Sequence, residues 1–319
     1  MLEIRAIKWN GLNVVSTFSG CGGSCLGYRM AGYRVLWASE FIEAAAEVYK
    51  LNHPNSILDR RDIRQVKPEE IVEAVDGKQI DILDGSPPCA SFSTAGKREA
   101  GWGKVKKYSD TKQRVDDLFF EFARILKGLQ PRVFVAENVS GLVKGTAKGY
   151  FLEILAALKA CGYRVRCKVL DAQWLGVPQM RQRTIFVGVH DDLKRDPVYP
   201  KPLPYRYSVR DVLPSIVSHE FMAPQHTVAF ASASKPAYTV SQLGNFSKKG
   251  AAYTRVTTDD GVTRSFTINE LKRICAFPDD FQLTGSFAQQ WERLGRAVPP
   301  VMMAAIASTI RDEVLNDDR

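Results

Sequence analysis

Nothing in this sequence indicates a membrane span or a secretory signal. Its apolar runs all fall short of the about 18 uninterrupted residues that cross a bilayer, and residues 1–8 lack an apolar signal core. The six cysteines include no Cys-x-x-Cys pair and have no histidine at ligand spacing, which argues against a bound metal and against a disulfide framework. We therefore expect a cytoplasmic monomer in a reducing compartment, associated with the nucleoid if the gene is bacterial or carried by a phage.

Internal repeats, low-complexity tracts and a Walker-type Lys-Ser/Thr motif are also missing, so triphosphate hydrolysis is disfavoured. Positive charge is what the chain has in excess, with 44 Lys and Arg against 35 Asp and Glu, a net charge of +9 and a pI near 9.2. This balance favours a polyanionic partner.

One basic, glycine-rich run with interleaved aromatic residues spans residues 96–108. A charge run is usually a solvated face, but the glycines here favour a lid that closes over a phosphate backbone. The candidate nucleic-acid contacts in this run are Lys97, Arg98, Lys104, Lys106 and Lys107.

Residues 1–190 alternate short apolar runs with helix-period segments, which predicts an α/β fold built of βαβ units around a mostly parallel sheet. The expected strands are 13–18, 34–39, 80–83, 132–136, 164–170 and 184–189, and the clearest helices cover 115–129 and 151–158. Seven prolines interrupt the pattern between 197 and 236. We expect residues 1–190 and 264–319 to form one domain and residues 191–263 to form a smaller, loop-rich one.

A glycine-rich segment, residues 18–23, joins the first expected strand to a helix. Glycines there let the backbone approach a ligand closely. Glu40 ends the next strand, where a Rossmann-like fold places an acid that accepts hydrogen bonds from ribose hydroxyls, and Asp62 is a third candidate. Glycine-rich turns are common, so Glu40 at the strand end is what favours a nucleotide-type cofactor.

The loop at residues 85–93 holds Cys89 directly after two prolines. Proline fixes φ and lacks an N–H donor, so this turn is rigid and can position a nucleophile. A lone cysteine in such a turn is more commonly a small buried hydrophobe, and the rest of the chain has to decide between the two interpretations.

Five blocks occur in order along the chain: residues 18–23 (FSGCGG), 87–89 (PPC), 137–139 (ENV), 179–183 (QMRQR) and 295–300 (GRAVPP). From about Asn13 to the last helix, the sequence resembles the DNA cytosine-5 methyltransferases. The resemblance implies a class I S-adenosylmethionine-dependent methyltransferase fold, Rossmann-like with helices on both faces of the sheet. It also implies an inserted target-recognition domain and double-stranded DNA as the partner, with the target cytosine flipped out of the duplex.

The chemistry of this family explains the residue types in the blocks. Carbon 5 of cytosine is too electron-poor to attack a sulfonium methyl group unaided, so a thiolate must first add at carbon 6, the role implied for Cys89. Glu137 matches the family's acid near ring nitrogen 3 and Arg183 its cation near oxygen 2, while Arg181 supports the site or a phosphate. The implied cofactor contacts are Phe18, Gly20, Gly22, Gly23, Glu40, Phe41, Asp62, Ile63, Pro88, Leu118, Arg296, Ala297 and Val298, and the further DNA contacts are Ser93, Thr239 and Ser241.

Arg296 departs from the family, which usually has asparagine there. Two like charges about 4 Å apart repel by about 4 kcal/mol at an effective dielectric of 20, so an arginine beside a sulfonium needs an anion. An acidic side chain or a DNA phosphate is one candidate. The other is a carboxylate on the transferred carbon, as in carboxy-S-adenosyl-L-methionine, which would make the enzyme a cytosine carboxymethyltransferase.

Two further alternatives stay open. One branch of the family methylates transfer RNA, so an RNA cytosine-5 methyltransferase with the same site is possible. An inactive binding module that kept the fold is the other, although binding alone does not require a nucleophile. Ala90 replaces the glutamine often found after Pro-Cys, which affects the loop contacts more than the nucleophile.

Overall fold

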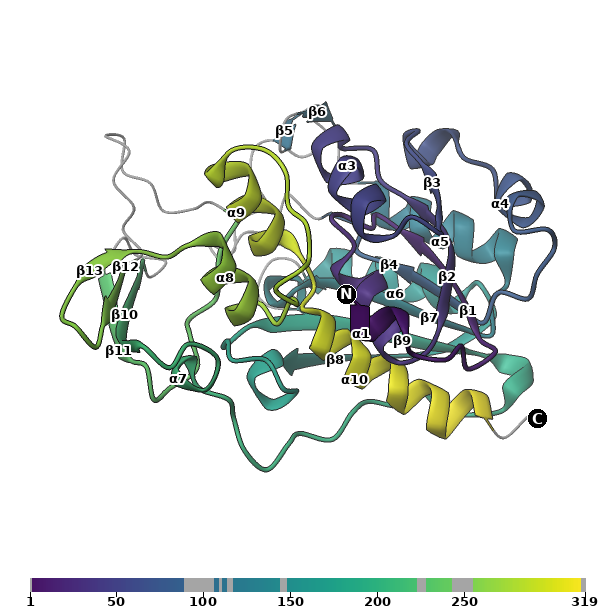
Figure 1. The fold of residues 1–319 in the computed structure, drawn as a ribbon. Coiled ribbons are helices and arrows are strands. Elements are labelled where there is room, and N and C mark those ends of the chain that lie inside the picture. The colour runs from purple at the N-terminus through teal and green to yellow at the C-terminus, as the bar shows by residue number, and fades with distance from the viewer. Residues whose placement is uncertain are drawn as a thin grey trace.

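A seven-stranded sheet forms the centre of the larger part of the molecule (Figure 1). The computed structural model describes residues 2–88, 106–108, 111–113, 117–143, 148–222, 228–242 and 255–316. The strand order is β3-β2-β1-β4-β7-β9-β8. The bounds are β1 Asn13–Thr17, β2 Arg34–Ser39, β3 Ile57–Asp59, β4 Ile82–Gly85, β7 Val133–Val139, β8 Tyr163–Asp171 and β9 Gln182–His190.

The pairing confirms the predicted mostly parallel sheet. β1 lies between β2 and β4, and β4 is paired with β7, all in parallel, so the carboxyl ends of these strands meet at one edge. β9 runs antiparallel to both β7 and β8. The six predicted strands are all present, whereas β3 is too short, at three residues, to show a period in the sequence.

One predicted boundary was wrong in a way that matters for the site. The strand expected at 132–136 continues to Val139, so Glu137 lies inside β7 and is paired with Ile185 of β9. The antiparallel partner β9 extends the ladder past the point where the apolar run of the sequence ends.

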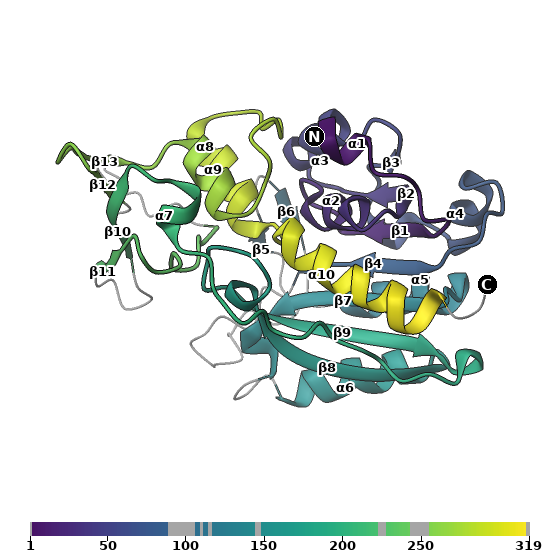
Figure 2. The same cartoon turned by 60° about the horizontal axis from the view of Figure 1, so that its bottom comes forward.

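Helices cover both faces of the sheet (Figure 2). On one face α2 and α10 pack together with the inward side chains of β1, β7 and β9. On the other, α4, α5 and α6 bury a second apolar cluster that includes Phe122 and Leu126. The bounds are α1 Leu2–Arg5, α2 Gly23–Met30, α3 Glu43–Asn52, α4 Pro68–Ala74, α5 Leu118–Leu129, α6 Lys148–Lys159 and α10 Pro300–Ile310, followed by a π-helical turn at Arg311–Leu315.

A second, antiparallel sheet lies apart from the first, in the order β11-β10-β12-β13. Its strands are β10 Ile216–Met222, β11 Val228–Ser232, β12 Arg255–Thr258 and β13 Thr263–Ser265, and α7 Val209–Val212, α8 Ile268–Ile274 and α9 Phe287–Arg296 lie between it and the large sheet (Figure 1). The expectation of a loop-rich module missed this sheet because its strands are short, at three to seven residues, and give little periodic signal. The predicted boundary at 263/264 falls within β13.

Helices α2 and α10 approach so closely that a side chain at Gly27 has no room. A Cβ there would lie 2.5 Å from the Pro300 carbonyl oxygen and 2.6 Å from the Met303 Cβ. We expect Gly27→Ala to lower the free energy of unfolding by about 1–3 kcal/mol, measured by urea denaturation. Gly149→Ala in α6 is the matched control, because a Cβ there meets nothing within 4 Å and alanine favours a helix. Equal effects of the two substitutions would contradict this packing.

Candidate active site

A cavity opens where β1, β2 and β4 end, and it has a volume of about 960 Å³ including its open mouth. Twelve of the predicted cofactor residues line it: Phe18, Gly20, Gly23, Glu40, Phe41, Asp62, Ile63, Pro88, Leu118, Arg296, Ala297 and Val298. Gly22 is in the same loop as Gly20 but does not line the cavity; it packs against His53 instead.

The glycine loop between β1 and α2 has a backbone that only small residues allow. Gly22 has φ +89, and a Cβ there would lie 2.3 Å from the Nε2 of His53. A Cβ on Gly23 would lie 2.4 Å from the Val298 carbonyl oxygen. The glycines therefore let the loop pack between α3 and the C-terminal segment, which brings two distant parts of the chain to one cavity wall.

His53 supports this loop from behind. Its Nε2 lies 3.1 Å from the Gly22 carbonyl oxygen, and its ring stacks on Tyr49 with 4.5 Å between centroids. Burial, reinforced by the nearby Arg29, lowers the pKa of His53 to about 3. The ring is therefore neutral and can donate its N–H to the carbonyl.

Glu40 closes one side of the cavity with a buried carboxylate. Its Oε2 accepts a hydrogen bond from the backbone N–H of Gly20 at 2.8 Å, and its Oε1 accepts one from Ile42 at 2.6 Å. Burial raises the pKa of Glu40, and these two donors oppose the shift. Each oxygen has a further lone-pair direction, so Glu40 can still accept hydrogen bonds from ligand hydroxyls.

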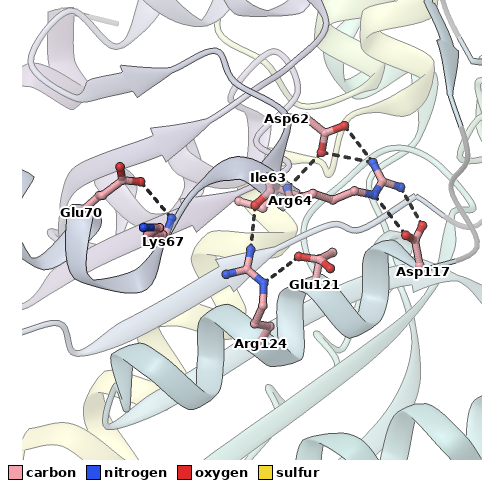
Figure 3. A network of polar contacts seen from close by, with 8 residues as sticks. All are labelled: Asp62, Ile63, Arg64, Lys67, Glu70, Asp117, Glu121 and Arg124. Atoms are coloured by element: carbon pink, nitrogen blue, oxygen red, sulfur yellow. Dashed lines mark hydrogen bonds and ion pairs between the residues drawn. The ribbon is translucent and has the colours of Figure 1, made fainter.

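Ion pairs hold the wall formed by Asp62, Ile63 and Leu118 (Figure 3). Arg64 pairs with Asp62 at 2.9 Å and with Asp117 at 2.6 Å. Asp117 immediately precedes α5, so this bridge fixes the turn after β3 against the start of that helix. The sequence suggested Asp62 as a ligand residue, and the structure shows that it also positions its neighbours.

A second group of polar side chains lies on β7 and β9. The Nε of Arg183 forms an ion pair with Oε1 of Glu137 at 2.7 Å, and both side chains are largely buried. Burial lowers the pKa of Arg183, and the Glu137 carboxylate works against that shift. The Nδ2 of Asn138 donates to the Pro87 carbonyl oxygen at 2.9 Å. The Glu-Asn-Val block is thereby joined to the Pro-Pro-Cys loop.

Several predicted site residues, including the candidate nucleophile, fall outside the described residues. These are Cys89, Ser93, Lys97, Arg98 and Lys104. Lys106 and Lys107 lie in β5 (Lys106–Tyr108), which pairs with β6 (Thr111–Gln113), and only their backbone is described. Pro88 and Ser86 line the cavity, so the described end of the Cys89 loop reaches its rim.

Arg181 is completely buried, and its side chain forms hydrogen bonds to backbone carbonyl oxygens. Its guanidinium donates to the carbonyl oxygens of Val240 at 3.1 Å, Gly295 at 2.8 Å and Ala297 at 2.9 Å. Burial lowers its pKa to about 9. Arg181 therefore has a supporting position: it holds the backbone at Val240, Gly295 and Ala297 in place.

Thr239 and Ser241 flank Val240, one of the residues that Arg181 contacts. The Thr239 hydroxyl donates to the Met180 carbonyl oxygen at 2.5 Å, and the Ser241 carbonyl oxygen accepts a hydrogen bond from the Trp291 Nε1 at 2.9 Å. Both residues are exposed. They are therefore held in place by their neighbours and remain accessible to a ligand.

Within the described residues there is no cluster of three or more His, Cys, Asp or Glu side chains suited to a metal ion. Of the helices that the structure describes, none has the length and apolarity that a membrane crossing requires.

Comparisons with known proteins agree with this geometry. A family model described as C-5 cytosine-specific DNA methylase matches residues 12–233 and 225–312. The chain belongs to this family. It is 29% identical over 343 residues to the type II methyltransferase M.NgoPII of Neisseria gonorrhoeae, covering 95% of this chain and 96% of that protein. It is 31% identical over 325 residues to M.BsuFI of Bacillus subtilis, covering 98% of this chain and 74% of that protein.

Solved structures show the same fold. The S. pombe Dnmt2 methyltransferase superposes with a TM-score of 0.66 at 18% identity, covering 94% of this chain and 98% of that one. The C-5 cytosine-specific DNA methylase family implies S-adenosylmethionine as the cofactor and DNA as the substrate. The predicted family and the predicted class I fold are both confirmed.

Two arginines from α9 line the cofactor cavity of this methylase-family chain. Arg296 pairs with Glu292 at 2.8 Å, and Arg293 lies 3.6 Å from the other oxygen of the same carboxylate. Glu292 is thus an anion for Arg296 from within the chain. Sequence reasoning missed Arg293 because α9 was not predicted. The signal that could have found this helix is the helical spacing of its apolar residues Phe287, Trp291 and Leu294.

Other cavity residues were also missed: Ser19, Cys21, Ser24, Ser39, Ile42, Ala45, Arg61 and Ser86. Most of them are neighbours of predicted residues along the chain. Their exposure to the cavity depends on backbone geometry at the strand ends, which a motif does not show.

We expect the free energy of unfolding to fall as the pH is lowered from 6.5 toward about 3. Folded His53 stays neutral down to a pKa of about 3, whereas the unfolded chain binds a proton near 6.5, so acid favours the unfolded state. His53→Gln should flatten this slope in urea titrations at a series of pH values. His190→Gln, at the partly exposed end of β9, is the control; an unchanged slope in His53→Gln would show that the buried imidazole does not carry the effect.

Proposed function

We propose that this protein is a DNA cytosine-5 methyltransferase that transfers the methyl group of S-adenosyl-L-methionine to carbon 5 of a flipped cytosine in duplex DNA. The observation that carries the proposal is the buried Glu137–Arg183 pair, at 2.7 Å, joined through Asn138 to the Pro87 carbonyl. The loop that carries Pro87 reaches the cavity, whose lining includes Ser86 and Pro88. Family membership supports the same chemistry.

The cavity fits the proposed cofactor. Glu40 has acceptor capacity for ribose hydroxyls, and Phe18, Phe41 and Leu118 provide an apolar wall for a purine ring. When bound, S-adenosylmethionine supplies an electrophilic methyl group on a sulfonium. The protein's task is to make carbon 5 of the base nucleophilic.

Cys89 does this by covalent addition. Its thiolate forms a bond to carbon 6, and the electron pair of the 5,6 double bond moves toward carbon 5 and the ring carbonyl. Glu137 acts as the acid: its carboxyl proton passes to ring nitrogen 3, where negative charge develops, and Arg183 orients Glu137 while its cation faces oxygen 2. Once carbon 5 has been alkylated, its proton passes to a water molecule, the 5,6 double bond re-forms, and the carbon–sulfur bond breaks with its electron pair leaving on the thiolate. The proton on ring nitrogen 3 then returns to Glu137.

The second sheet and the basic run contact the DNA in this proposal. The target base leaves the stack at a cost of a few kcal/mol that protein–strand contacts offset. Ser93, the lysines of residues 97–107, Thr239 and Ser241 supply such contacts, and residues 191–263 read the sequence as a target-recognition domain. One monomer carries the complete site.

The proposal is tested by covalent trapping on duplex DNA that contains 5-fluorocytosine. Wild-type protein with S-adenosylmethionine should remain attached after denaturation, because fluorine cannot leave as a proton does. Cys89→Ser should form no adduct and lose methylation by at least about a thousandfold, since the nucleophile is gone. Cys161→Ser, which changes a partly exposed cysteine elsewhere, should behave as wild type. Methylation by Cys89→Ser at the wild-type rate, or methylation of transfer RNA in preference to DNA, would reject the proposal.

A carboxymethyl donor is the second candidate, and the specific observation in its favour is that Arg293 and Arg296 share one carboxylate, Glu292, on the cavity wall. Both guanidinium groups line the cavity in which a cationic cofactor would bind, with Glu292 and Glu40 as carboxylates that act on them. A carboxylate on the transferred carbon would be a further anion for these two cations. By contrast, Glu292 already gives Arg296 an anion. The arginine therefore does not require a carboxylate on the donor, and this favours the ordinary methyl donor.

Arg296→Asn separates these candidates. With a methyl donor as the natural cofactor, we expect the variant to keep its donor preference and to bind S-adenosylmethionine about tenfold more tightly, since a like charge is removed. The measurement is mass spectrometry of nucleosides after incubation with DNA and an equal mixture of S-adenosylmethionine and carboxy-S-adenosylmethionine. Carboxymethylcytosine formed by wild type and lost in Arg296→Asn would favour the second candidate.

A further inference from the structure

A buried carboxylate lies directly behind the cofactor cavity and has no part in the chemistry proposed above. Asp84, on β4, is 1% exposed. Its Oδ2 accepts hydrogen bonds from the Ser16 hydroxyl at 2.9 Å and the Ser24 hydroxyl at 2.8 Å, and the Tyr28 hydroxyl lies 3.3 Å from its Oδ1. Four residues of β1, α2 and β4 thus form one buried polar cluster.

The cluster reaches the cavity through serine side chains. Ser24 lines the cavity and donates directly to Asp84. Ser19 also lines it, and its hydroxyl lies 3.0 Å from that of Ser16, the second serine that contacts Asp84. A single hydroxyl therefore separates the carboxylate from the ligand space.

Asp84 has no counter-ion in the described part of the chain. The groups that face it from α2 are the Cys25 thiol and the Tyr28 hydroxyl, which stay neutral because burial raises the pKa of each far above 7. From β7, the nearest charged group is the Glu137 carboxylate, whose negative charge disfavours ionisation of Asp84. Hydrogen bonds alone stabilise the anion, and an isolated buried charge is costly to fold.

The balance of these effects raises the pKa of Asp84 to about 7, chiefly through burial. A raised carboxyl pKa means that the folded state prefers the proton, so stability is lost as the pH rises from about 4 through 7. Packing would be served better by asparagine or an apolar residue. The presence of a carboxylate at this position therefore indicates a role in binding a ligand next to it.

We infer that Asp84 determines charge preference in the cofactor cavity: through Ser24, its carboxylate favours a cationic ligand over a neutral one of the same shape. The inference rests on the proposed function, in which the ligand is a sulfonium before transfer and a neutral thioether afterwards. A fixed anion behind the cavity stabilises the bound sulfonium and does not stabilise the bound thioether. The protein thereby takes up the donor and releases the spent product.

The test compares the affinities of S-adenosylmethionine and S-adenosylhomocysteine by titration calorimetry at pH 8. Asp84→Asn keeps the side-chain size and removes the charge. We expect it to weaken S-adenosylmethionine binding about tenfold, to leave S-adenosylhomocysteine binding within about twofold, and to keep or raise the melting temperature. Between pH 6 and pH 8, the preference for the sulfonium should rise in wild type and stay flat in Asp84→Asn.

Asp81→Asn is the matched control, because Asp81 is also buried but lies at the opposite end of β4. It accepts a hydrogen bond from the Asn13 N–H at 2.7 Å and pairs with Arg132 at 3.3 Å. This variant should lose thermal stability and keep the wild-type ratio of the two affinities. Equal weakening of both ligands in Asp84→Asn, or an unchanged ratio, would overturn the inference. Wild type that binds neither ligand would instead reject the proposed cofactor.

Discussion

The buried guanidinium of Arg181 is the constraint on which the arrangement of the site depends. It joins the segment around Val240 to Gly295 and Ala297 at the end of α9 through three hydrogen bonds to carbonyl oxygens. Arg181 itself stands two residues before Arg183, which pairs with Glu137. One side chain thus connects the wall of the cofactor cavity, the segment next to the second sheet, and the polar pair on β7 and β9. Removing a buried cation of this kind leaves three carbonyls without donors, and such losses are costly.

The two halves of the site meet because β4 and β7 are neighbours in the sheet. The loop after β4 carries Pro87 and Pro88, and β7 carries Glu137 and Asn138. Asn138 fixes the start of the Cys89 loop at Pro87, while Glu40 and His53 fix the glycine loop on the other side of β1. Rigid elements on both sides therefore define the space in which donor and base have to meet.

The sequence predicted the parallel sheet, because buried parallel strands have apolar runs that depend on local pattern. Most of the residues suggested for a cofactor line one cavity, since they follow strands whose carboxyl ends meet at one edge of the sheet. The second sheet was not foreseen, since its strands are too short to show a clear period in the sequence. Arg181 could be found by its motif, but its three carbonyl partners could not, because they come from residues 240–297. The same holds for Asp84: the predicted strand ended one residue before it, and only the packing of α2 against β4 shows that serine and tyrosine hydroxyls surround it.

The cofactor cavity is completed late along the chain. Arg293, Arg296, Ala297 and Val298 form one of its walls, and the glycine loop packs against Val298 although the loop lies near the other end of the sequence. During translation the cavity therefore stays incomplete until residues 293–298 have left the ribosome. A nascent chain can form the strands of the large sheet before that point and still lack one wall of the cavity.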